Sequence, residues 1–321
     1  MSSVRLARTF ALLAVTLLGA CGGGGGSDDG PTIPTPADGL QSFTLPGYPH
    51  AIDVYGVGDA DRAVVILHGA GGRNYGIAHD LGLNGNEGAP PTAASIDFER
   101  LRERHVIAVF PQGQAKAGNA HTWSNRVMDS GQDDMAFLSA LATYIRTQYG
   151  ISQVYLMGHS NGAMMANRFW CESAATFDAY IAIAGPASAY FLTHACAPSV
   201  KRPYYGIVGN ADAVIGAAGN WDAQTWTINK VLVGVTAEGA YVDPTMIGEW
   251  EQHKRHANAV CATTPALAQG ALVGNVVTWL DCSGTLKVQR ILTADHKIAS
   301  LEDASGFSLF DAAIDFIDSV D

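Results

Sequence analysis

Residues 153–169, QVYLMGHSNGAMMANRF, are the segment that decides the fold. The apolar run at 153–157 is typical of a buried strand, and residues 161–173 repeat apolar side chains at helical spacing. Between them lies Gly158-His159-Ser160-Asn161-Gly162, a G-x-S-x-G motif in the strand, turn and helix context that the motif requires. Such a turn strains its serine, and its glycines avoid collisions with neighbouring elements. We therefore predict that Ser160 is an exposed nucleophile; an incidental turn serine is the alternative.

The rest of the chain repeats this alternation of strand and helix. Helical periodicity occurs at 92–104, 132–149 and 161–173. Continuous β-branched, apolar runs predict strands buried on both faces of a sheet, at 63–67, 105–110, 153–157, 179–184, 204–208 and 286–292. This order predicts an α/β fold with a doubly wound, mostly parallel sheet and helices on both faces. In such sheets the reactive groups lie on loops at the carboxyl ends of the strands.

A serine nucleophile needs a base, and the base needs a carboxylate that orients it. The strand predicted at 204–208 leads into Asp212, and the strand predicted at 286–292 leads into His296. Ser160, Asp212 and His296 thus follow the chain order nucleophile, acid and base, each after its own strand. Asp212 could instead cap a helix, which leaves Asp222 and Asp243 as alternative acids.

Other histidines also follow Ser160 in the chain. His253 and His256 lie among charged residues in a helical run at 247–258, which indicates a solvent-exposed helix face. His194 comes shortly before a cysteine that we expect to be bridged. His296 is therefore the predicted base.

The tetrahedral intermediate of such a reaction carries an oxyanion that needs fixed N–H donors. One predicted donor is the backbone N–H of Asn161, at the start of the helix after the nucleophile. The other lies in the loop His68-Gly69-Ala70-Gly71-Gly72, where small residues let the backbone approach a substrate. We assign it to Ala70, with Gly71 as the alternative. A phosphate-binding loop is disfavoured because neither Gly-Lys-Ser/Thr nor G-x-G-x-x-G is present.

Three tryptophans, Trp123, Trp221 and Trp226, fall in loops that we expect to flank the cleft. Aromatic walls suit a polymer chain or a cinnamoyl ring. We predict that these residues bind substrate; packing in the core or at the rim is the alternative.

The amino terminus is predicted to be an export signal. Arg5 and Arg8 precede an apolar run, Phe10 to Leu18, that is about half the length of a membrane-spanning helix. It leads into Leu18-Gly19-Ala20-Cys21, which resembles the lipobox of bacterial lipoproteins, with Cys21 as the lipidated residue. An uncleaved membrane anchor is the alternative. The expected location is the outer membrane, cell surface or periplasm, or release as a secreted enzyme.

These features divide the chain into three parts. Residues 1–20 are the predicted signal peptide, 21–38 a Gly/Pro-rich flexible tether, and 39–321 a single catalytic domain. The 321-residue chain has a formal net charge of −11. An acidic surface repels phosphate backbones, so nucleic-acid binding is disfavoured, and we expect a monomer.

The cysteines other than Cys21 form an even set in a chain predicted to reach an oxidising compartment. Sequence alone allows three connectivities. The local pairs, Cys171 with Cys196 and Cys261 with Cys282, are the predicted bridges. Free thiols or a metal site are the alternative, although no Cys-x-x-Cys or Cys-x-x-His spacing is present.

Several motifs together resemble one enzyme family. They are HGAGG at 68–72, FPQG at 110–113, HTWSN at 121–125, QDDMAFLSAL at 132–141, VYLMGHSNGAMMANRFWCE at 154–172, GNAD at 209–212 and the late Cys261/Cys282 pair. Over most of residues 45–317 the chain is similar to the polyhydroxybutyrate depolymerase and feruloyl esterase-like branch of the α/β-hydrolases. This resemblance implies an α/β-hydrolase fold and a secreted serine esterase, without metal or organic cofactor. The implied substrates are polyesters or acyl groups on plant polysaccharides.

The chain departs from this family near the base. The family has Gly-His followed by Trp-Pro-Gly, whereas here Asp295-His296 is followed by Lys297-Ile298-Ala299. Residues 213–243 are also longer than the family's link at this point. Because both changes border the expected cleft, the resemblance implies the reaction more firmly than the substrate. A non-catalytic binding lipoprotein on the same scaffold and a peptidase are the alternatives.

Overall fold

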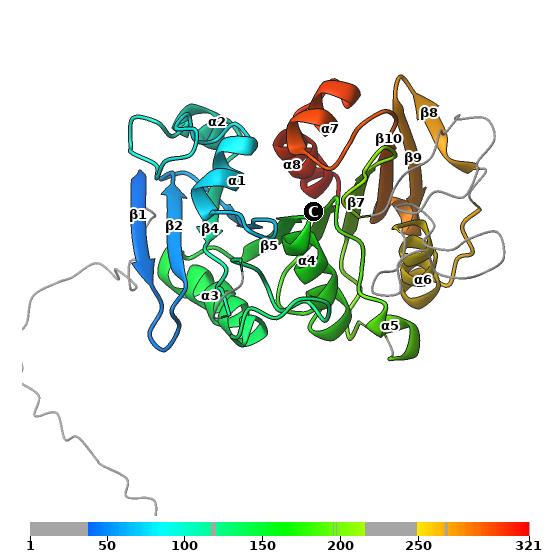
Figure 1. The fold of residues 1–321 in the computed structure, drawn as a ribbon, viewed down its shortest axis with the longest axis horizontal. Helices are drawn as coiled ribbons and strands as arrows, with labels where there is room; N and C mark the ends of the chain where they lie inside the picture. The colour runs from blue at the N-terminus through cyan, green and yellow to red at the C-terminus, as the bar shows by residue number, and fades with distance from the viewer. Residues whose placement is uncertain are drawn as a thin grey trace, which may run out of the picture. The chain divides into compact units, whose positions relative to one another are not determined.

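The computed structural model describes residues 38–116, 120–194, 196, 198–215, 249–266 and 269–320. Cys21, the predicted signal peptide, and Trp221 and Trp226 lie outside the described residues. The described part forms one ten-stranded sheet in the order β1-β2-β4-β3-β5-β6-β7-β10-β9-β8 (Figure 1).

The predicted strands form the parallel centre of this sheet. They are β3 (Arg62–Leu67), β4 (Val106–Pro111), β5 (Gln153–His159), β6 (Tyr180–Ile183), β7 (Tyr204–Gly209) and β10 (Leu286–Ile291). Each is parallel to its neighbour within this group, in the order β4-β3-β5-β6-β7-β10. Their residues are almost all buried, as expected of strands covered on both faces. The prediction of a doubly wound α/β sheet is confirmed.

Antiparallel strands that the sequence analysis did not predict extend the sheet at both edges. They are β1 (Gly39–Thr44) and β2 (Ala51–Gly56) at one edge, and β8 (Ala271–Val273) and β9 (Val276–Asp281) at the other. β1 has no fully buried residue and β8 is exposed throughout, so neither carries the continuous apolar run by which the central strands were recognised.

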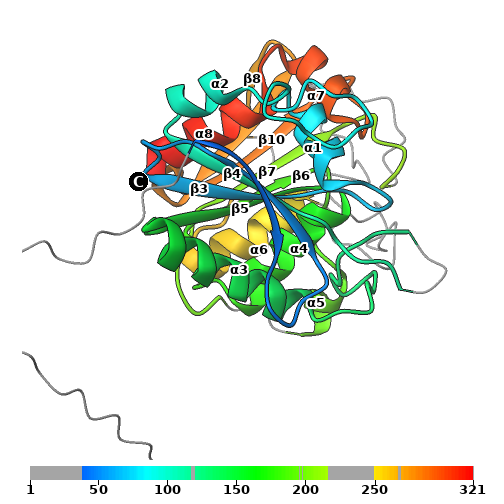
Figure 2. The same cartoon turned by 90° about the vertical axis from the view of Figure 1, so that its left-hand side faces the viewer.

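Helices cover both faces of the sheet (Figure 2). On one face lie α3 (Asp134–Tyr149), α4 (Asn161–Glu172), the short α5 (Tyr190–Thr193) and α6 (Glu249–Cys261). The other face carries α1 (Asn74–Asp80), α2 (Phe98–Glu103), α7 (Ile298–Ser305) and α8 (Leu309–Val320). Two apolar cores result, one on each side of the sheet.

The helix boundaries follow local capping. α3 begins where the Asp133 carboxylate accepts the Ala136 N–H at 3.0 Å, and it ends at Gly150, which adopts a left-handed conformation with φ of 64°. The helix predicted at 92–104 is shorter than expected. Asp97 caps α2 by accepting the Arg100 N–H at 3.1 Å, so the preceding residues form turns instead.

The prediction that His253 and His256 face solvent is wrong. Both side chains are buried, with exposed fractions of 0% and 1%. Together with Ala257 and Val260 they occupy one face of α6 at helical spacing, whereas the neighbouring charged residues occupy another. His253 Nε2 lies 2.7 Å from an Asp281 carboxylate oxygen, and His256 stacks on Trp170 with ring centroids 3.6 Å apart.

Both predicted disulfides are present, Cys171–Cys196 and Cys261–Cys282. The second joins the end of α6 to the 3₁₀ turn η2 (Cys282–Gly284) that precedes β10. Such bridges are typical of proteins in oxidising compartments. No helix in the described ranges combines the length and apolar composition that a membrane crossing requires.

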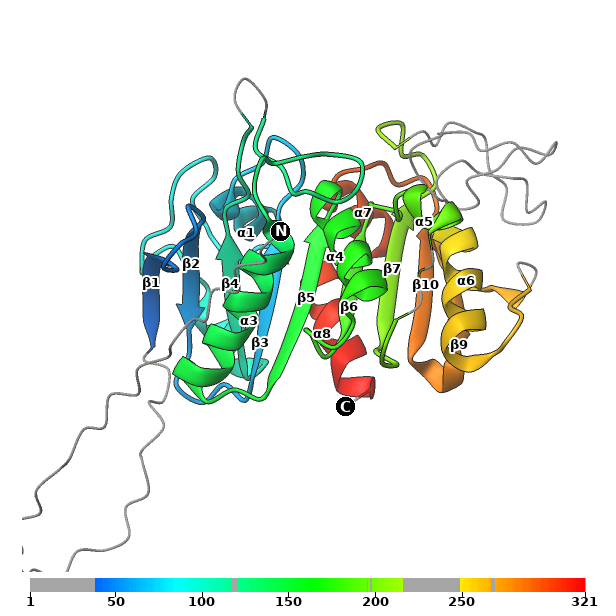
Figure 3. The same cartoon turned by 90° about the horizontal axis from the view of Figure 1, so that it is seen from below.

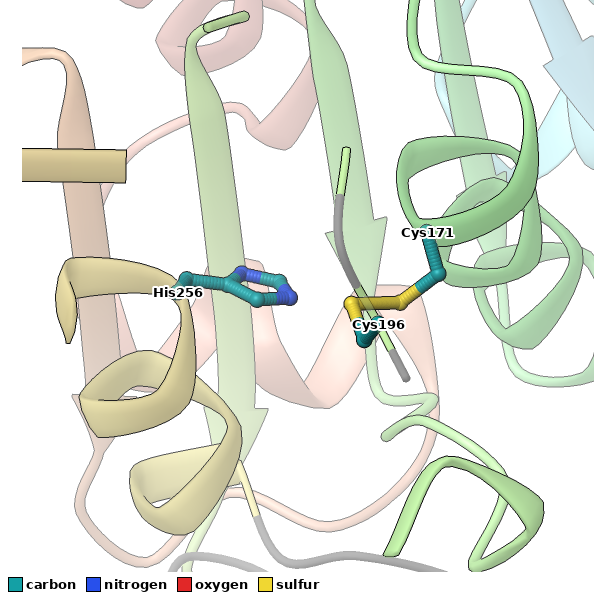
Figure 4. Close-up of side chains that lie close together, drawn as sticks. All are labelled: Cys171, Cys196 and His256. Carbon is teal, nitrogen blue, oxygen red and sulfur yellow. A yellow bond between two sulfur atoms is a disulfide. The ribbon is translucent and has the colours of Figure 1, made fainter. Parts of the chain in front are cut away.

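The first disulfide lies beside a buried imidazole, as Figure 4 shows for His256 of α6 and the bridge from Cys171 of α4. Cys171, Cys196 and His256 form the one group of metal-ligating residue types found close together in the described part of the chain. Because the two sulfur atoms are bonded to each other, they offer no thiolates for a metal ion.

Candidate active site

Ser160 lies in a strained turn between β5 and α4. Its backbone has φ of 54° and ψ of −119°, a conformation that costs a non-glycine residue on the order of 1–3 kcal/mol. Close approaches around the turn require glycine: a Cβ at Gly158 would lie 2.3 Å from backbone atoms of Gly162, and one at Gly185 would lie 2.2 Å from the Ser160 carbonyl oxygen. The close packing of β5, α4 and the loop after β6 thus holds the turn.

Parallel pairing places the carboxyl-terminal ends of the central strands on the same side of the sheet (Figure 3). Leu67 at the end of β3 pairs with Gly158 of β5, and Gly209 at the end of β7 pairs with Ile291 of β10. The loops after these strands therefore emerge on the same side.

Asp212 and His296 form a hydrogen-bonded pair. An Asp212 carboxylate oxygen lies 2.6 Å from His296 Nδ1. The other oxygen accepts the backbone N–H groups of Val214 (2.9 Å) and Ile215 (3.2 Å), and the Asp212 side chain is fully buried. With Nδ1–H donating to the carboxylate, the lone pair of a neutral His296 ring is on Nε2.

The loop that carries His296 is tied to its neighbours. Thr293 N–H donates to the Asn210 side chain at 2.6 Å, and Ala211 N–H donates to the Ala294 carbonyl at 2.9 Å. This approach requires Gly209, because a Cβ there would lie 2.5 Å from carbonyl oxygens of the loop. The structure therefore couples the acid loop to the base loop directly.

His159 supports the loop that carries His296, a role that the sequence analysis did not predict. Its Nε2–H donates to the carbonyl oxygen of His296 at 2.8 Å. Burial lowers the pKa of His159 to about 4, so the ring is neutral near neutral pH. The only signal was its place in the G-x-S-x-G motif, where any residue type is allowed.

The two predicted oxyanion donors border the same cleft as Ser160. Within the described ranges the backbone N–H groups of Ala70 and Asn161 donate to no other group. The alternative donor, Gly71, gives its N–H to the carbonyl of His121 at 2.7 Å. Of Ala70 and Gly71, Ala70 is therefore the residue whose N–H is available in the described structure.

His68 anchors the loop that carries Ala70. Gly113 N–H donates to His68 Nε2 at 2.9 Å, so Nδ1 carries the proton and donates to the Gly69 carbonyl at 2.7 Å. Burial lowers the pKa of His68 to about 4, so the ring stays neutral.

Trp123 does not form a wall of the cleft, contrary to the sequence prediction. Its side chain is fully buried and it does not line the cleft. The indole N–H donates to the His68 carbonyl at 3.0 Å. Of the other candidates, His194 lies outside the cleft, and Asp222 and Asp243 fall outside the described residues.

The cleft has a volume of about 440 Å³, and its lining residues include two groups of unlike chemistry, here called its two walls. One wall is one face of α1 at helical spacing, with a cation and an anion at its ends and small or apolar residues between them: Arg73, Gly76, Ile77 and Asp80. The other wall is apolar: Val127, Met128, Met164, Val214 and Ile215. Ser160 and His296 lie in the same cleft.

No model of a known protein family and no curated protein matches this chain. Solved structures do match. An acetyl xylan esterase from Aspergillus awamori is similar with 13% identity and a TM-score of 0.50, over 81% of this chain and 94% of that one. The esterase Pf2001 of Pyrococcus furiosus has 12% identity and a TM-score of 0.48, over 87% and 91% of the two chains. At this identity the likeness concerns the fold alone, and the chain has the α/β-hydrolase fold.

Proposed function

We propose that this protein is a serine carboxylic-ester hydrolase that works through an acyl-enzyme. The observation that carries this proposal is the buried Asp212 bonded to His296, in one cleft with a Ser160 held at a strained turn. These residue types in this chain order supply a nucleophile, a base and an orienting acid.

In the proposed reaction, Ser160 Oγ attacks the ester carbonyl carbon while His296 Nε2 takes the hydroxyl proton. The N–H groups of Ala70 and Asn161 bind the oxyanion that forms. The carbon–oxygen bond to the alcohol then breaks, and His296 returns the proton to the leaving oxygen. Water repeats the sequence on the acyl-enzyme, which releases the acid and restores Ser160. Ser160 Oγ has no hydrogen bond in the described part of the chain, so its contact with His296 is expected to form with substrate bound.

For the substrate, we propose an acylated polysaccharide, carrying feruloyl or acetyl esters, in preference to a polyester such as polyhydroxyalkanoate. A polyester presents the same unit on both sides of the ester bond, whereas an acylated sugar joins an apolar acyl group to a hydroxyl-rich alcohol. The two unlike walls of the cleft fit the second description. Arg73 and Asp80 can hydrogen-bond hydroxyl groups, and the apolar wall, which includes Met128 and Met164, suits the acyl group.

Kinetics of triad variants test the reaction. With p-nitrophenyl acetate, Ser160→Ala and His296→Ala should each lower kcat by roughly 10³- to 10⁶-fold. Asp212→Asn should cost less, because a poorly oriented base still accepts protons. Ser139→Ala, on α3 and outside the cleft, is the matched control and should keep the wild-type rate. Wild-type activity in His296→Ala would remove the triad.

A panel of substrates tests the proposed substrate class and the peptidase alternative. Methyl ferulate and acetylated xylan should be hydrolysed faster than polyhydroxybutyrate film, and peptide anilides should not be cleaved. Faster release of hydroxybutyrate from the film would contradict the preference drawn from the cleft walls. Cleavage of the anilides alone would favour the peptidase alternative.

We also propose that the protein is exported and anchored through lipid on Cys21, on the basis of the apolar leader and the Leu-Gly-Ala-Cys sequence. In a bacterial host, labelled palmitate should enter the wild type and not a Cys21→Ser variant. Equal labelling of both would contradict the anchor.

A further inference from the structure

Trp123 is hydrogen-bonded to both of the segments that carry the proposed oxyanion donors. Its indole N–H donates to the carbonyl of His68, two residues before Ala70. Its backbone N–H donates to the side-chain oxygen of Asn161 at 2.7 Å, and the Asn161 amide nitrogen donates back to the Trp123 carbonyl at 3.3 Å. One fully buried residue thus links the loop after β3 to the first residue of α4.

We propose that Trp123 is a positioning residue that fixes the distance and aim of the two oxyanion donors relative to each other. This inference rests on the proposed esterase function. An oxyanion hole works because its donors already point at the place where charge develops, within about 2.7–3.1 Å of it. The segment at 69–72 is Gly-Ala-Gly-Gly, which by itself has wide backbone freedom. Contacts from outside the segment are therefore needed to fix the direction of the Ala70 N–H.

The segment that carries Trp123 is itself anchored in the core. Ser124, the next residue, donates its backbone N–H to an Asp134 carboxylate oxygen at 2.7 Å. The other Asp134 oxygen lies 2.9 Å from His50 Nε2, and both of these side chains are fully buried. The His50 ring stacks between Phe137 and Trp123, with centroids 3.8 Å and 6.2 Å away. Trp123 therefore transmits a rigid position from α3 to the oxyanion loop.

Trp123 cannot act by touching substrate, since it is fully buried and does not line the cleft. Loss of its indole N–H should therefore affect the transition state and leave ground-state binding almost unchanged. This expectation separates positioning from a contribution to the substrate pocket.

The test removes this N–H and compares the result with the same substitution at a second buried tryptophan. Trp123→Phe keeps an aromatic ring in the core but cannot donate to His68. Since deleting an oxyanion donor outright costs about 10²- to 10³-fold in kcat, misaiming one should lower kcat by about 10- to 100-fold, with KM changed less than about twofold. The Ki of a trifluoromethyl ketone, whose serine adduct carries an oxyanion, should rise by the factor by which kcat/KM falls.

Trp170→Phe is the matched control. Trp170 is also fully buried, and its indole N–H also donates to a backbone carbonyl, that of Arg202 at 3.2 Å. Among the described residues, its side chain has no hydrogen bond to the loop at 68–72 or to Asn161. Both variants should lose a similar amount of thermal stability, and only Trp123→Phe should lose kcat and inhibitor affinity. Should Trp123→Phe not fold, benzothienylalanine at position 123 removes the same N–H with the ring size unchanged.

The outcomes are distinct. Equal kcat and equal Ki in the folded Trp123 variant and the Trp170 control would overturn the positioning role while leaving the esterase intact. Ester hydrolysis that survives Ser160→Ala would overturn the proposed function itself, and the positioning role with it.

Discussion

At the scale of single residues, the site depends on close backbone approaches that only glycine permits. Gly158, Gly162 and Gly185 surround Ser160, and a Cβ at any of them would lie within 2.5 Å of a backbone atom. Backbone cannot move aside as a flexible side chain can, so these contacts hold Ser160 in its strained conformation. Gly185 is outside the G-x-S-x-G motif, which shows that the motif records only part of this requirement.

We expect Gly185→Ala to destabilise the fold by about 2–4 kcal/mol, because the new methyl group would lie 2.2 Å from the Ser160 carbonyl oxygen. Urea unfolding measures this. Gly76→Ala on α1 is the control. A Cβ there has no contact closer than 3.8 Å, and its unfolding free energy should be unchanged or raised by up to about 1 kcal/mol. Equal stability of the two variants would contradict the steric account.

Buried histidines give the fold a defined response to acid. Burial lowers the pKa of His68 from 6.5 to about 4 in the folded chain. Between these values the unfolded chain binds a proton that the folded chain does not, so acidification favours unfolding. The free energy of unfolding should fall by about 1.4 kcal/mol per pH unit for each such group, from about pH 6.5 towards pH 4.

In His68→Gln, the free energy of unfolding should fall less steeply with acidification, by up to about 1.4 kcal/mol less per pH unit. Urea unfolding at pH 7, 6 and 5 measures this. His159, for which burial also lowers the pKa to about 4, maintains part of the slope in the variant. An unchanged slope would show that His68 takes up its proton in the folded state.

Residue by residue, the sequence predicted what depends on the chain locally. Ser160, Asp212 and His296 each follow a recognisable strand, and the structure brings Asp212 and His296 into contact. His159 and Trp123 were missed or misassigned, since their partners are far away in the chain. Trp123 contacts His68 and Asn161, and no local pattern records such contacts.

At the scale of elements, continuous apolar runs identified the central strands, because burial on both faces leaves no room for polar residues. The same criterion fails at the edges of the sheet, where β1 and β8 are partly or wholly exposed. Apolar periodicity, the corresponding criterion for helices, fails for α6, because its buried face includes two histidines and Gln252 instead of a full apolar stripe. Tertiary packing decided that face, and composition alone indicated a solvated helix.

The bridge Cys261–Cys282 ties α6 to the turn before β10, the strand that leads to His296. Replacing both cysteines by serine should lower the free energy of unfolding by about 3 kcal/mol, since the loop is no longer closed in the unfolded chain. Thermal melts with and without reductant measure this, and reductant should destabilise the wild type more than the variant. Non-reducing peptide mapping that pairs Cys171 with Cys261 would contradict the bridges described.

At the scale of the whole molecule, the parallel sheet explains why residues from distant parts of the chain meet. The loops after β3, β5, β7 and β10 emerge at the carboxyl-terminal ends of the strands, and they carry Ala70, Ser160, Asp212 and His296 in that order. The departure from the resembled family after His296 lies next to this end of the strands, and the described part of the other departure, residues 213–215, follows Asp212 there. The parallel sheet therefore brings these loops together although they are far apart in the sequence.

The central claim is that Ser160 is a nucleophile activated by His296. A fluorophosphonate reports this directly, because its phosphorus forms a covalent bond with an activated serine and releases fluoride. Mass spectrometry of the intact protein should show a single adduct, and peptide mapping should place it on Ser160. The adduct should be absent in Ser160→Ala and form far more slowly in His296→Ala, with EDTA without effect on the wild type. An unlabelled wild type, or labelling that persists in Ser160→Ala, would contradict the account.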